Sequence, residues 1–182
     1  MLFRSTRQRL AAAEGRTLED VIAPGLRVLF CGINPGLYSA AVGHHFARPG
    51  NRFWGAVYSA GFTPRLLVPA DATSLLAHGC GLTDIVARAT ASADELDPAE
   101  LVMGRRRLER KARRFRPRWI AILGIGAYRT AFARPHAVFG PQPERIGDTG
   151  LWVLPNPSGL NAHYQSAALA RAFLALRHAL EP

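Results

Sequence analysis

The chain has 182 residues, which suits one domain with a full hydrophobic core and leaves little room for a second. Its apolar runs fall short of the ~18–20 residues that a membrane-spanning helix needs. The N-terminus also lacks the apolar core of a signal peptide. We therefore expect a cytoplasmic monomer with no membrane partner, forming a single domain over residues 1–182 with a basic lead-in over 1–24.

The chain is strongly basic. Its formal net charge is +10, from 23 basic and 13 acidic residues, and its isoelectric point is near 11.1. An excess of this size favours polyanionic partners, chiefly nucleic acid or a membrane surface. A general preference for arginine and alanine, which runs through the whole sequence, would give the same charge. Charge alone therefore does not separate a nucleic-acid-binding protein from an arginine-rich one.

Residue usage argues against two kinds of chemistry. Cys31 and Cys80 are the only cysteines and lie far apart, which excludes a four-thiolate iron–sulfur cluster and argues against structural zinc. The adjacent His44 and His45 could bind a metal, but neighbouring loop histidines more often serve as surface hydrogen-bonding groups. We expect no metal and no cofactor. The one lysine, Lys111, lies in an arginine-rich stretch rather than beside a candidate pocket, so Schiff-base chemistry is not expected.

Strands and helices alternate along the chain. Short apolar runs bounded by glycine or proline are typical of buried strands, and apolar residues three or four apart are typical of helices. The pattern predicts, in chain order, a strand at 26–31, a helix at 51–60, a short helix at 71–78, a strand at 81–86, a helix from 98 to just before 117, a strand at 119–124, a short helix at 128–132, short strands or a turn within 134–150, a strand at 151–154 and a last helix at 163–180.

This order predicts an α/β fold, a three-layer α/β/α arrangement with a central, largely parallel sheet flanked by helices. In such folds, sites form in the loops beyond the carboxyl ends of the strands. The segments 32–36 and 155–160 each follow a predicted strand directly. We therefore expect these two loops to lie at the same edge of the sheet and to form the functional site.

The first of these loops reads Gly-Ile-Asn-Pro-Gly over residues 32–36. Proline after Asn34 favours an extended backbone there, and the glycines allow a ligand to approach the chain closely. An asparagine amide is no strong base, but it can hold a water molecule or contact a heterocycle. Downstream, Phe46 stands in a polar loop outside any periodic pattern, where its ring could stack on a nucleobase or plug the edge of the core.

The second loop reads Asn-Pro-Ser-Gly-Leu over residues 156–160. Asn156, Ser158 and the local backbone amides are suited to gripping phosphates. Leu160 has two interpretations. An exposed leucine at a loop tip can wedge into a base stack, but the spacing alone favours a place at the start of the core of the last helix.

Together these motifs resemble the mismatch-specific uracil/thymine DNA glycosylases of the uracil-DNA glycosylase superfamily. Gly-Ile-Asn-Pro-Gly-Leu at 32–37 and Asn-Pro-Ser-Gly-Leu at 156–160 carry the resemblance, and Pro-Gly-Asn-Arg-Phe-Trp at 49–54 supports it. Each motif alone could arise by chance, but the three in this order are specific. The resemblance extends from about residue 26 to the last helix.

The resemblance implies roles for individual residues. Asn34 would position the attacking water, and Phe46 would stack on the base beside the Ile33 backbone. Gly36 falls where related enzymes of stricter specificity carry a bulky residue, which implies a wider pocket, and Ser39 would affect whether the methyl group of thymine fits. The DNA-binding loop would comprise Asn156 beside the base or phosphates, then Ser158, Gly159, Leu160 as the wedge, and Asn161.

The implied function is monofunctional hydrolysis of the N-glycosidic bond of uracil in DNA, leaving an abasic site and using no cofactor. The partner would be double-stranded DNA that contains uracil or a mismatched or damaged pyrimidine. Single-stranded DNA would be a second candidate substrate. Two alternatives stay open: a superfamily relative that prefers deaminated purines, and a non-catalytic protein that binds damaged DNA. Asn34 and Gly36 argue against the last, because a pure binder need not keep them.

Three features depart from the pattern or extend it. Some family members carry an arginine that reaches the opposite guanine where this chain has Ala162, which puts opposite-base discrimination in question. Asp94 is a candidate for assisting water activation, although a helix cap is the simpler explanation, and Asp84 has a weaker claim of the same kind. The stretch 105–118 holds eight arginines. It either binds the DNA backbone or forms a solvated helix face, and we favour the second interpretation.

Overall fold

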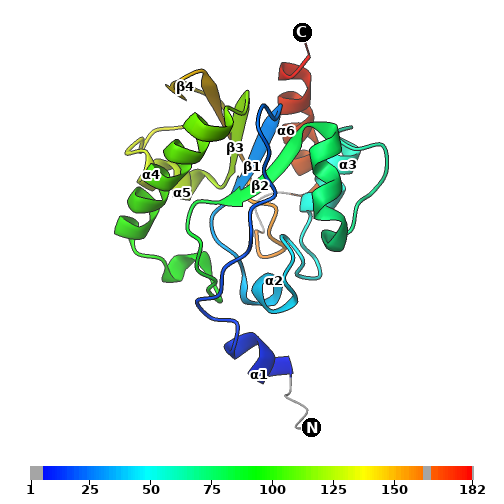
Figure 1. Cartoon of the computed structure of the whole chain (residues 1–182), viewed down its shortest axis with the longest axis vertical. Helices are drawn as coiled ribbons and strands as arrows, with labels where there is room; N and C mark the ends of the chain where they lie inside the picture. Colours follow the sequence, from blue (N-terminus) through cyan, green and yellow to red (C-terminus); the bar gives the residue numbers. More distant parts are fainter. Residues whose placement is uncertain (1–5, 162–164, 182) are drawn as a thin grey trace.

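The computed structural model describes residues 6–161 and 165–181. At its centre lies a five-stranded sheet with the order β2-β1-β3-β5-β4 (Figure 1). The strands are β1 Val28–Gly32, β2 Cys80–Asp84, β3 Trp119–Leu123, β4 Gly140–Ile146 and β5 Thr149–Leu154. All neighbouring pairs are parallel except the pair of β4 with β5, which places the antiparallel strand at one edge. The predicted, largely parallel α/β sheet is thereby confirmed.

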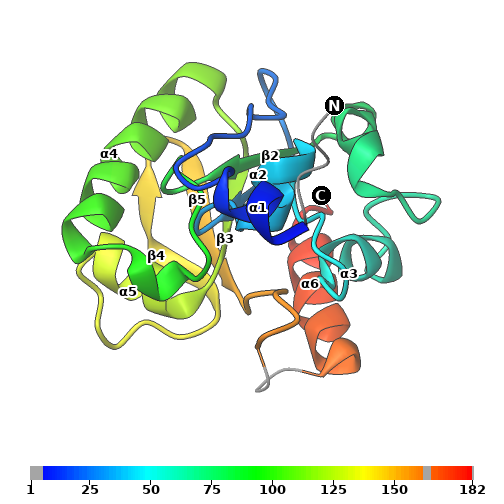
Figure 2. The same cartoon turned by 90° about the horizontal axis from the view of Figure 1, so that it is seen from below.

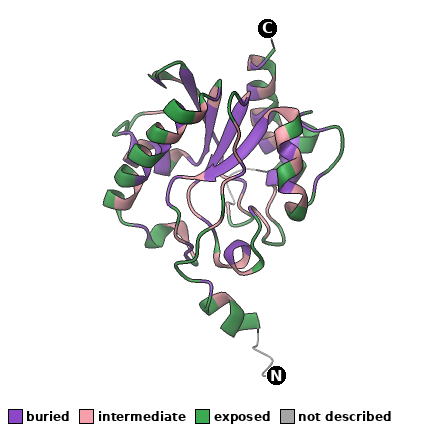
Figure 3. Ribbon diagram, in the orientation of Figure 1, coloured by how far each residue is buried: buried purple, intermediate pink, exposed green. Residues whose placement is uncertain are grey.

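Helices cover both faces of the sheet, because alternate strand residues point in opposite directions. Val28 and Phe30 pack toward α3 (Phe53–Ser59), the 3-10 helix η1 (Pro69–His78) and α6 (Ser166–Ala179). Leu29 and Cys31 pack toward α4 (Pro98–Phe115) and α5 (Ile125–Ala131). Figure 3 shows the consequence: the four parallel strands are buried, while most of the edge strand β4 and the outer faces of the helices are more exposed. This double burial explains why the central strands β1, β3 and β5 are rich in apolar residues.

Helix α4 shows how local sequence sets its bounds. Asp97 precedes the helix, and the Glu100 carboxylate accepts a hydrogen bond from the Asp97 amide at 2.9 Å in a capping box. Pro98 occupies the first helical position, where its missing N–H costs nothing. The helix ends at Phe115, and the next residue, Arg116, adopts a left-handed conformation before Pro117. The predicted start and end of this helix are both confirmed.

Several features differ from the sequence pattern. The short helices α1 (Thr6–Ala11) and α2 (Leu37–Val42) were not predicted, because each is under two turns long and has no apolar stripe of its own. The basic lead-in also packs on the sheet, since Val21 and Leu82 exchange two backbone hydrogen bonds of 2.9 and 2.7 Å. The described part of the last helix begins at Ser166. Within residues 6–161 and 165–181, the helices are too short or too polar to span a bilayer.

Candidate active site

A cavity of about 890 Å³ opens at the carboxyl edge of the sheet, the side from which Figure 2 views the molecule. The loops that follow β1, β2, β3 and β5 all contribute to its wall, as expected for a parallel sheet. The predicted site residues that line it are Ile33, Asn34, Gly36, Ser39, Phe46, Asp94, Asn156, Ser158, Leu160 and Asn161. The fold therefore brings the two predicted loops together around one cavity.

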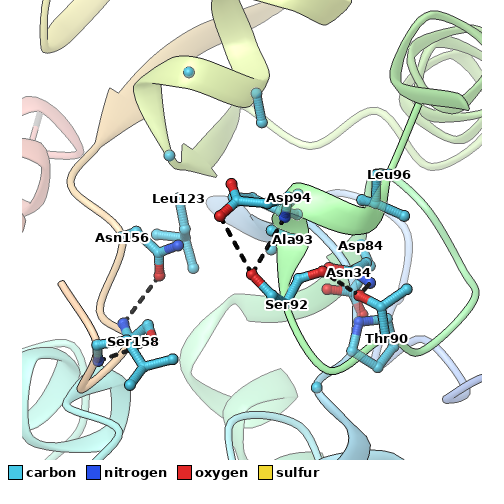
Figure 4. Close-up of a pocket in the computed structure, with 18 of the residues that line it drawn as sticks. Asn34, Asp84, Thr90, Ser92, Ala93, Asp94, Leu96, Leu123, Asn156 and Ser158 are labelled. Carbon is cyan, nitrogen blue, oxygen red and sulfur yellow. Dashed lines mark hydrogen bonds between the residues drawn. The ribbon is translucent and has the colours of Figure 1, made fainter. Parts of the chain in front are cut away.

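Asn34 is held in one orientation (Figure 4). Its Nδ2 donates hydrogen bonds to the Arg88 carbonyl at 3.0 Å and to the Thr90 hydroxyl at 2.7 Å. The Thr90 hydroxyl in turn donates to the Ser92 carbonyl at 2.7 Å. Because a carbonyl oxygen only accepts, the Asn34 nitrogen must face Arg88. Its Oδ1 accepts no hydrogen bond from the described residues and remains available as an acceptor at the cavity.

The backbone around Asn34 is fixed as well. Amides of the segment 85–90, which follows β2, donate to the carbonyls of Gly32, Ile33 and Pro35 at 2.9, 2.9 and 3.1 Å. The chain after β1 thus continues to pair with the chain after β2 beyond the end of the regular strands. Asn34 therefore stands on an extension of the sheet rather than on a free loop.

Gly36 leaves open space at the cavity wall. Its φ of −74° and ψ of 158° are extended backbone angles that any residue adopts. A Cβ added there would meet nothing within 4 Å. The backbone therefore does not require glycine at this position, and the effect of the glycine is to leave the space beside Asn34 unfilled.

Phe46 has an unusual backbone and a supported ring. Its φ is +53°, a left-handed conformation that costs a non-glycine residue about 1–3 kcal/mol. The ring stacks on Phe53 of the core, with centroids 4.2 Å apart and planes 23° from parallel. The next residue is anchored, since the Ala47 amide donates to the buried Ser39 hydroxyl at 3.0 Å. Ser39 therefore holds the Phe46 loop in addition to lining the cavity.

Sequence reasoning missed a buried contact between His45 and Asp84. His45 Nδ1 lies 3.5 Å from Asp84 Oδ2, with the side chains only 6% and 9% exposed. His45 Nε2 lies 2.8 Å from the Glu19 carbonyl, and the Trp54 indole donates to the His45 carbonyl at 3.3 Å. The expectation that His45 is a surface group is therefore wrong, although its neighbour His44 is exposed. Burial raises the pKa of Asp84 to about 6, against the opposing effect of His45.

The second loop folds back on itself. The Asn156 Oδ1 accepts the Ser158 amide at 2.9 Å, and the Asn161 Nδ2 donates to the Asn156 carbonyl at 2.9 Å. The Leu160 amide donates to the Ser158 hydroxyl at 3.3 Å. Leu160 itself is 66% exposed and precedes α6. The interpretation of Leu160 as a core residue is wrong, and its side chain stands at the rim of the cavity.

Arg52 joins the second loop to the rest of the site. Its Nη2 donates to the carbonyls of Ser158 at 3.0 Å and Asn161 at 3.2 Å, and its amide donates to the Pro157 carbonyl at 3.0 Å. Gly159 lies against the same segment, because a Cβ there would stand 2.8 Å from the Gly50 carbonyl oxygen. The Pro-Gly-Asn-Arg motif thus supports the second loop. The sequence does not reveal this contact, because its two segments lie more than a hundred residues apart.

The remaining candidates lie as follows. Asp94 is exposed in the 3-10 helix η2 (Ala93–Glu95), where its amide donates to the Ser92 hydroxyl at 3.4 Å. A Ser92–Glu95 capping box surrounds it, so a cap accounts for its surroundings, and its catalytic role stays a prediction. Arginines of the 105–118 stretch do not line the cavity. Ala162 lies outside the described residues.

Two comparisons place this geometry among known proteins. The sequence matches the model of the uracil DNA glycosylase superfamily over residues 19–178. The fold is similar to the solution structure of a candidate uracil DNA glycosylase from Methanosarcina acetivorans, with a TM-score of 0.56 and 20% sequence identity over 90% of this chain and 99% of that one. The family match includes all the residues that line the cavity except Leu18. The chain belongs to the uracil DNA glycosylase superfamily.

Proposed function

We propose that this protein is a monofunctional DNA glycosylase that flips uracil out of DNA and hydrolyses its N-glycosidic bond, leaving an abasic site. The observation that carries the proposal is the fixed amide of Asn34. Its nitrogen is held by Arg88 and Thr90, and its oxygen is available as an acceptor at the wall of the cavity. A water molecule that donates to this oxygen is held beside the sugar of a flipped nucleotide, oriented for attack.

A neutral amide suits this reaction because the bond to the base can break largely before water attacks. The sugar then carries positive charge and the departing base negative charge, so donors near the base matter more than a strong nucleophile. Asn156 supplies such a donor: its Oδ1 is taken by the Ser158 amide, while its Nδ2 donates to none of the described residues. Asn34 orients the water and Asn156 stabilises the leaving base.

Phe46 and Gly36 define the base pocket in this proposal. Stacking of a base on the Phe46 ring is worth about 1–3 kcal/mol and tolerates different bases. The space left open at Gly36 accommodates groups larger than the edge of uracil. We therefore propose that the range extends to thymine from G·T pairs and to damaged pyrimidines such as ethenocytosine.

Leu160 engages the DNA. It is the exposed apolar tip of a loop otherwise tied down by hydrogen bonds, and it stands at the cavity rim. A leucine in that position fills the gap that a flipped nucleotide leaves in the stack. Flipping is least costly for a mismatched or unpaired base, so we expect G·U pairs and single strands to be better substrates than A·U pairs.

The proposal of monofunctional chemistry rests on Lys111, the one lysine in the sequence. Its ammonium is bound to the Asp20 carboxylate at 2.6 Å and donates to the Thr83 hydroxyl at 2.8 Å. It does not line the cavity. A paired, charged lysine outside the cavity is unsuited to attack the sugar, which leaves water as the nucleophile.

The deciding experiment incubates the protein with end-labelled duplexes containing G·U, A·U or G·T, with single-stranded uracil DNA, and with a duplex containing hypoxanthine. We expect uracil release, with strand cleavage only after alkali. Cleavage without alkali would contradict the monofunctional mechanism. Release of hypoxanthine alone would instead identify a deaminated-purine enzyme. Tight binding to uracil DNA with no release from any substrate would identify a non-catalytic damage binder.

A further inference from the structure

The N-terminal lead-in binds the chain segment that holds the Asn34 amide. The Gly15 amide donates to the Ala89 carbonyl at 2.9 Å, and the Ala89 amide donates to the Arg16 carbonyl at 2.8 Å. Both backbone groups of Ala89 are therefore occupied by the lead-in. Residues 13–16 precede the part of the chain, 19–178, that matches the superfamily. The lead-in thus adds a support from outside the matched part.

The segment Arg88-Ala89-Thr90 lies between the Asn34 loop and the lead-in. In an extended chain, the backbone groups of alternate residues point to opposite edges. On one edge, the Arg88 carbonyl accepts from the Asn34 Nδ2 at 3.0 Å, and the Thr90 amide donates to the Pro35 carbonyl at 3.1 Å. On the other edge, Ala89 binds the lead-in. The segment that anchors the Asn34 amide is therefore held from both sides.

The lead-in also packs beside the helix that follows the Asn34 loop. Ala13 forms one small cluster with Ala89 and with Ala40 of α2, and all three side chains are at most 6% exposed. Helix α2 begins at Leu37, three residues after Asn34, and α1 lies against it (Figure 2). Because Ala13 is completely buried, a larger side chain there has no room unless the lead-in moves away.

The lead-in has a second attachment that does not depend on this cluster. Val21 exchanges two backbone hydrogen bonds with Leu82 of the sheet, at 2.9 and 2.7 Å. Release of residues 13–16 therefore leaves the sheet and its core in place. It frees one edge of the segment that anchors Asn34, and the effect is local.

We propose that residues 13–16 of the lead-in are a positioning element that holds the Asn34 amide in place through Arg88 and Thr90. The proposal rests on the proposed function, since Asn34 is taken to orient the attacking water. Ala13 does not line the cavity and does not touch the reacting atoms. Release of the lead-in lets the anchors of Asn34 shift, and a small misplacement of the water slows the chemical step without changing the affinity for DNA.

The test displaces the lead-in within the full chain. For Ala13→Leu we expect the single-turnover rate on single-stranded uracil DNA to fall about tenfold, with an unchanged dissociation constant from its dependence on protein concentration. Ala12→Leu, at the exposed neighbouring position, is the matched control and should behave as the wild type. Gly15→Pro removes the amide that binds Ala89, and proline does not fit the φ of +73°, so the same loss is expected by a different route.

A direct readout follows the Asn34 side chain itself. Its two amide protons are held by Arg88 and Thr90, so their exchange with water reports whether these anchors open. By NMR we expect this exchange to be about tenfold faster in Ala13→Leu and Gly15→Pro than in the wild type and in Ala12→Leu.

A double-mutant cycle separates positioning from a general loss of stability. Thr90→Val removes one of the two anchors through which the lead-in is proposed to act. In that background, Ala13→Leu should therefore cost less than about threefold in rate. Losses that multiply in full would show that the lead-in acts on another part of the protein and would overturn the proposal.

Two further outcomes overturn it. One is wild-type exchange of the Asn34 amide in both lead-in variants. The other is a dissociation constant that weakens as much as the rate falls, which would identify the lead-in as a DNA-binding segment. Because amide exchange needs no substrate, it is independent of the uracil-release assay. Faster exchange in a protein that releases no base contradicts the proposed reaction alone, whereas uracil release with unchanged exchange contradicts the positioning role alone.

Discussion

The two loops that face each other across the cavity are held in opposite ways. The first loop, residues 32–36, is an extension of the sheet: its carbonyls accept three amides of the segment 85–90, and the Asn34 side chain is bound at two points. The second loop, residues 156–161, is tied mainly to itself through Asn156 and Ser158, with Arg52 bracing it from outside. The first loop is therefore held by the sheet, whereas the second loop is held by its own hydrogen bonds and by Arg52.

This difference fits the tasks that we propose for them. A water-positioning group must keep its geometry to within a fraction of an ångström, which favours rigid support from the sheet. A DNA-engaging loop meets a deformable partner, and its exposed tip, Leu160, must leave water for the base stack. The contrast predicts that substitution of Asn34 in the first loop changes the chemical step, whereas substitution of Leu160 at the tip of the second loop changes only how duplex DNA is opened.

The largest expected effect is that of Asn34→Ala. Removing the amide leaves the water without its acceptor, and we expect the single-turnover rate on single-stranded uracil DNA to fall about 10²–10³-fold with the DNA dissociation constant unchanged. Thr90→Val is the graded control: it removes one of two anchors of the Asn34 amide and should cost about tenfold. An Asn34→Ala enzyme with the wild-type rate would show that Asn34 does not position the water. It would also contradict the proposed difference between the two loops.

Gly36→Phe tests whether the first loop also sets base selectivity. The added ring enters space that is empty at Gly36, so we expect excision of thymine from G·T to fall roughly 30-fold more than excision of uracil from G·U. Gly36→Ala should change neither rate by more than about twofold, since its Cβ meets nothing and the backbone angles are ordinary. Equal losses on both bases would place Gly36 away from the base.

The sequence predicts those structural features that are set by residues close together in the chain. Strands β1, β3 and β5 could be predicted because burial on both faces makes them rich in apolar residues, as in Phe30 and its neighbours, whereas the half-exposed, polar β4 could not be bounded. Helix α4 was bounded by its own Asp97 and Pro98. The Asn34 loop was placed correctly because a motif that directly follows a buried strand of a parallel sheet has one edge to occupy.

The features that sequence reasoning missed are contacts between distant segments. Arg52 supports carbonyls of Ser158 and Asn161 more than a hundred residues away, and no local pattern marks such a partner. His45 seemed a surface residue because the loop around it is polar, yet it is buried against Asp84 of β2. Leu160 gave the opposite error: its spacing matched the apolar face of α6, but the chain turns before that helix begins.

Leu160→Ala should act on duplex DNA alone. The wedge matters only where a stack must be kept open, so we expect the rate on an A·U duplex to fall about tenfold and the rate on single-stranded uracil DNA to change less than about twofold. Leu174→Ala, a partly exposed leucine on α6 that does not line the cavity, controls for loss of apolar surface. A loss of the same size on single strands would show that Leu160 supports the pocket instead.

The smallest expected effect is that of Gly159→Ala, which tests the contact between the second loop and the 48–52 segment. Gly159→Ala places a Cβ 2.8 Å from the Gly50 carbonyl oxygen, and because that neighbour is backbone the two segments must move apart. We expect a loss of about 1–2 kcal/mol in the free energy of unfolding, measured by urea denaturation, with a few-fold loss of activity on duplex DNA.

The matched control is Gly55→Ala, at an exposed position of α3 where a Cβ meets nothing. It should instead raise the free energy of unfolding by about 0.5–1 kcal/mol. A Gly159→Ala protein as stable and as active as the wild type would mean that the second loop does not depend on the 48–52 segment, and the bracing by Arg52 would then have no energetic weight.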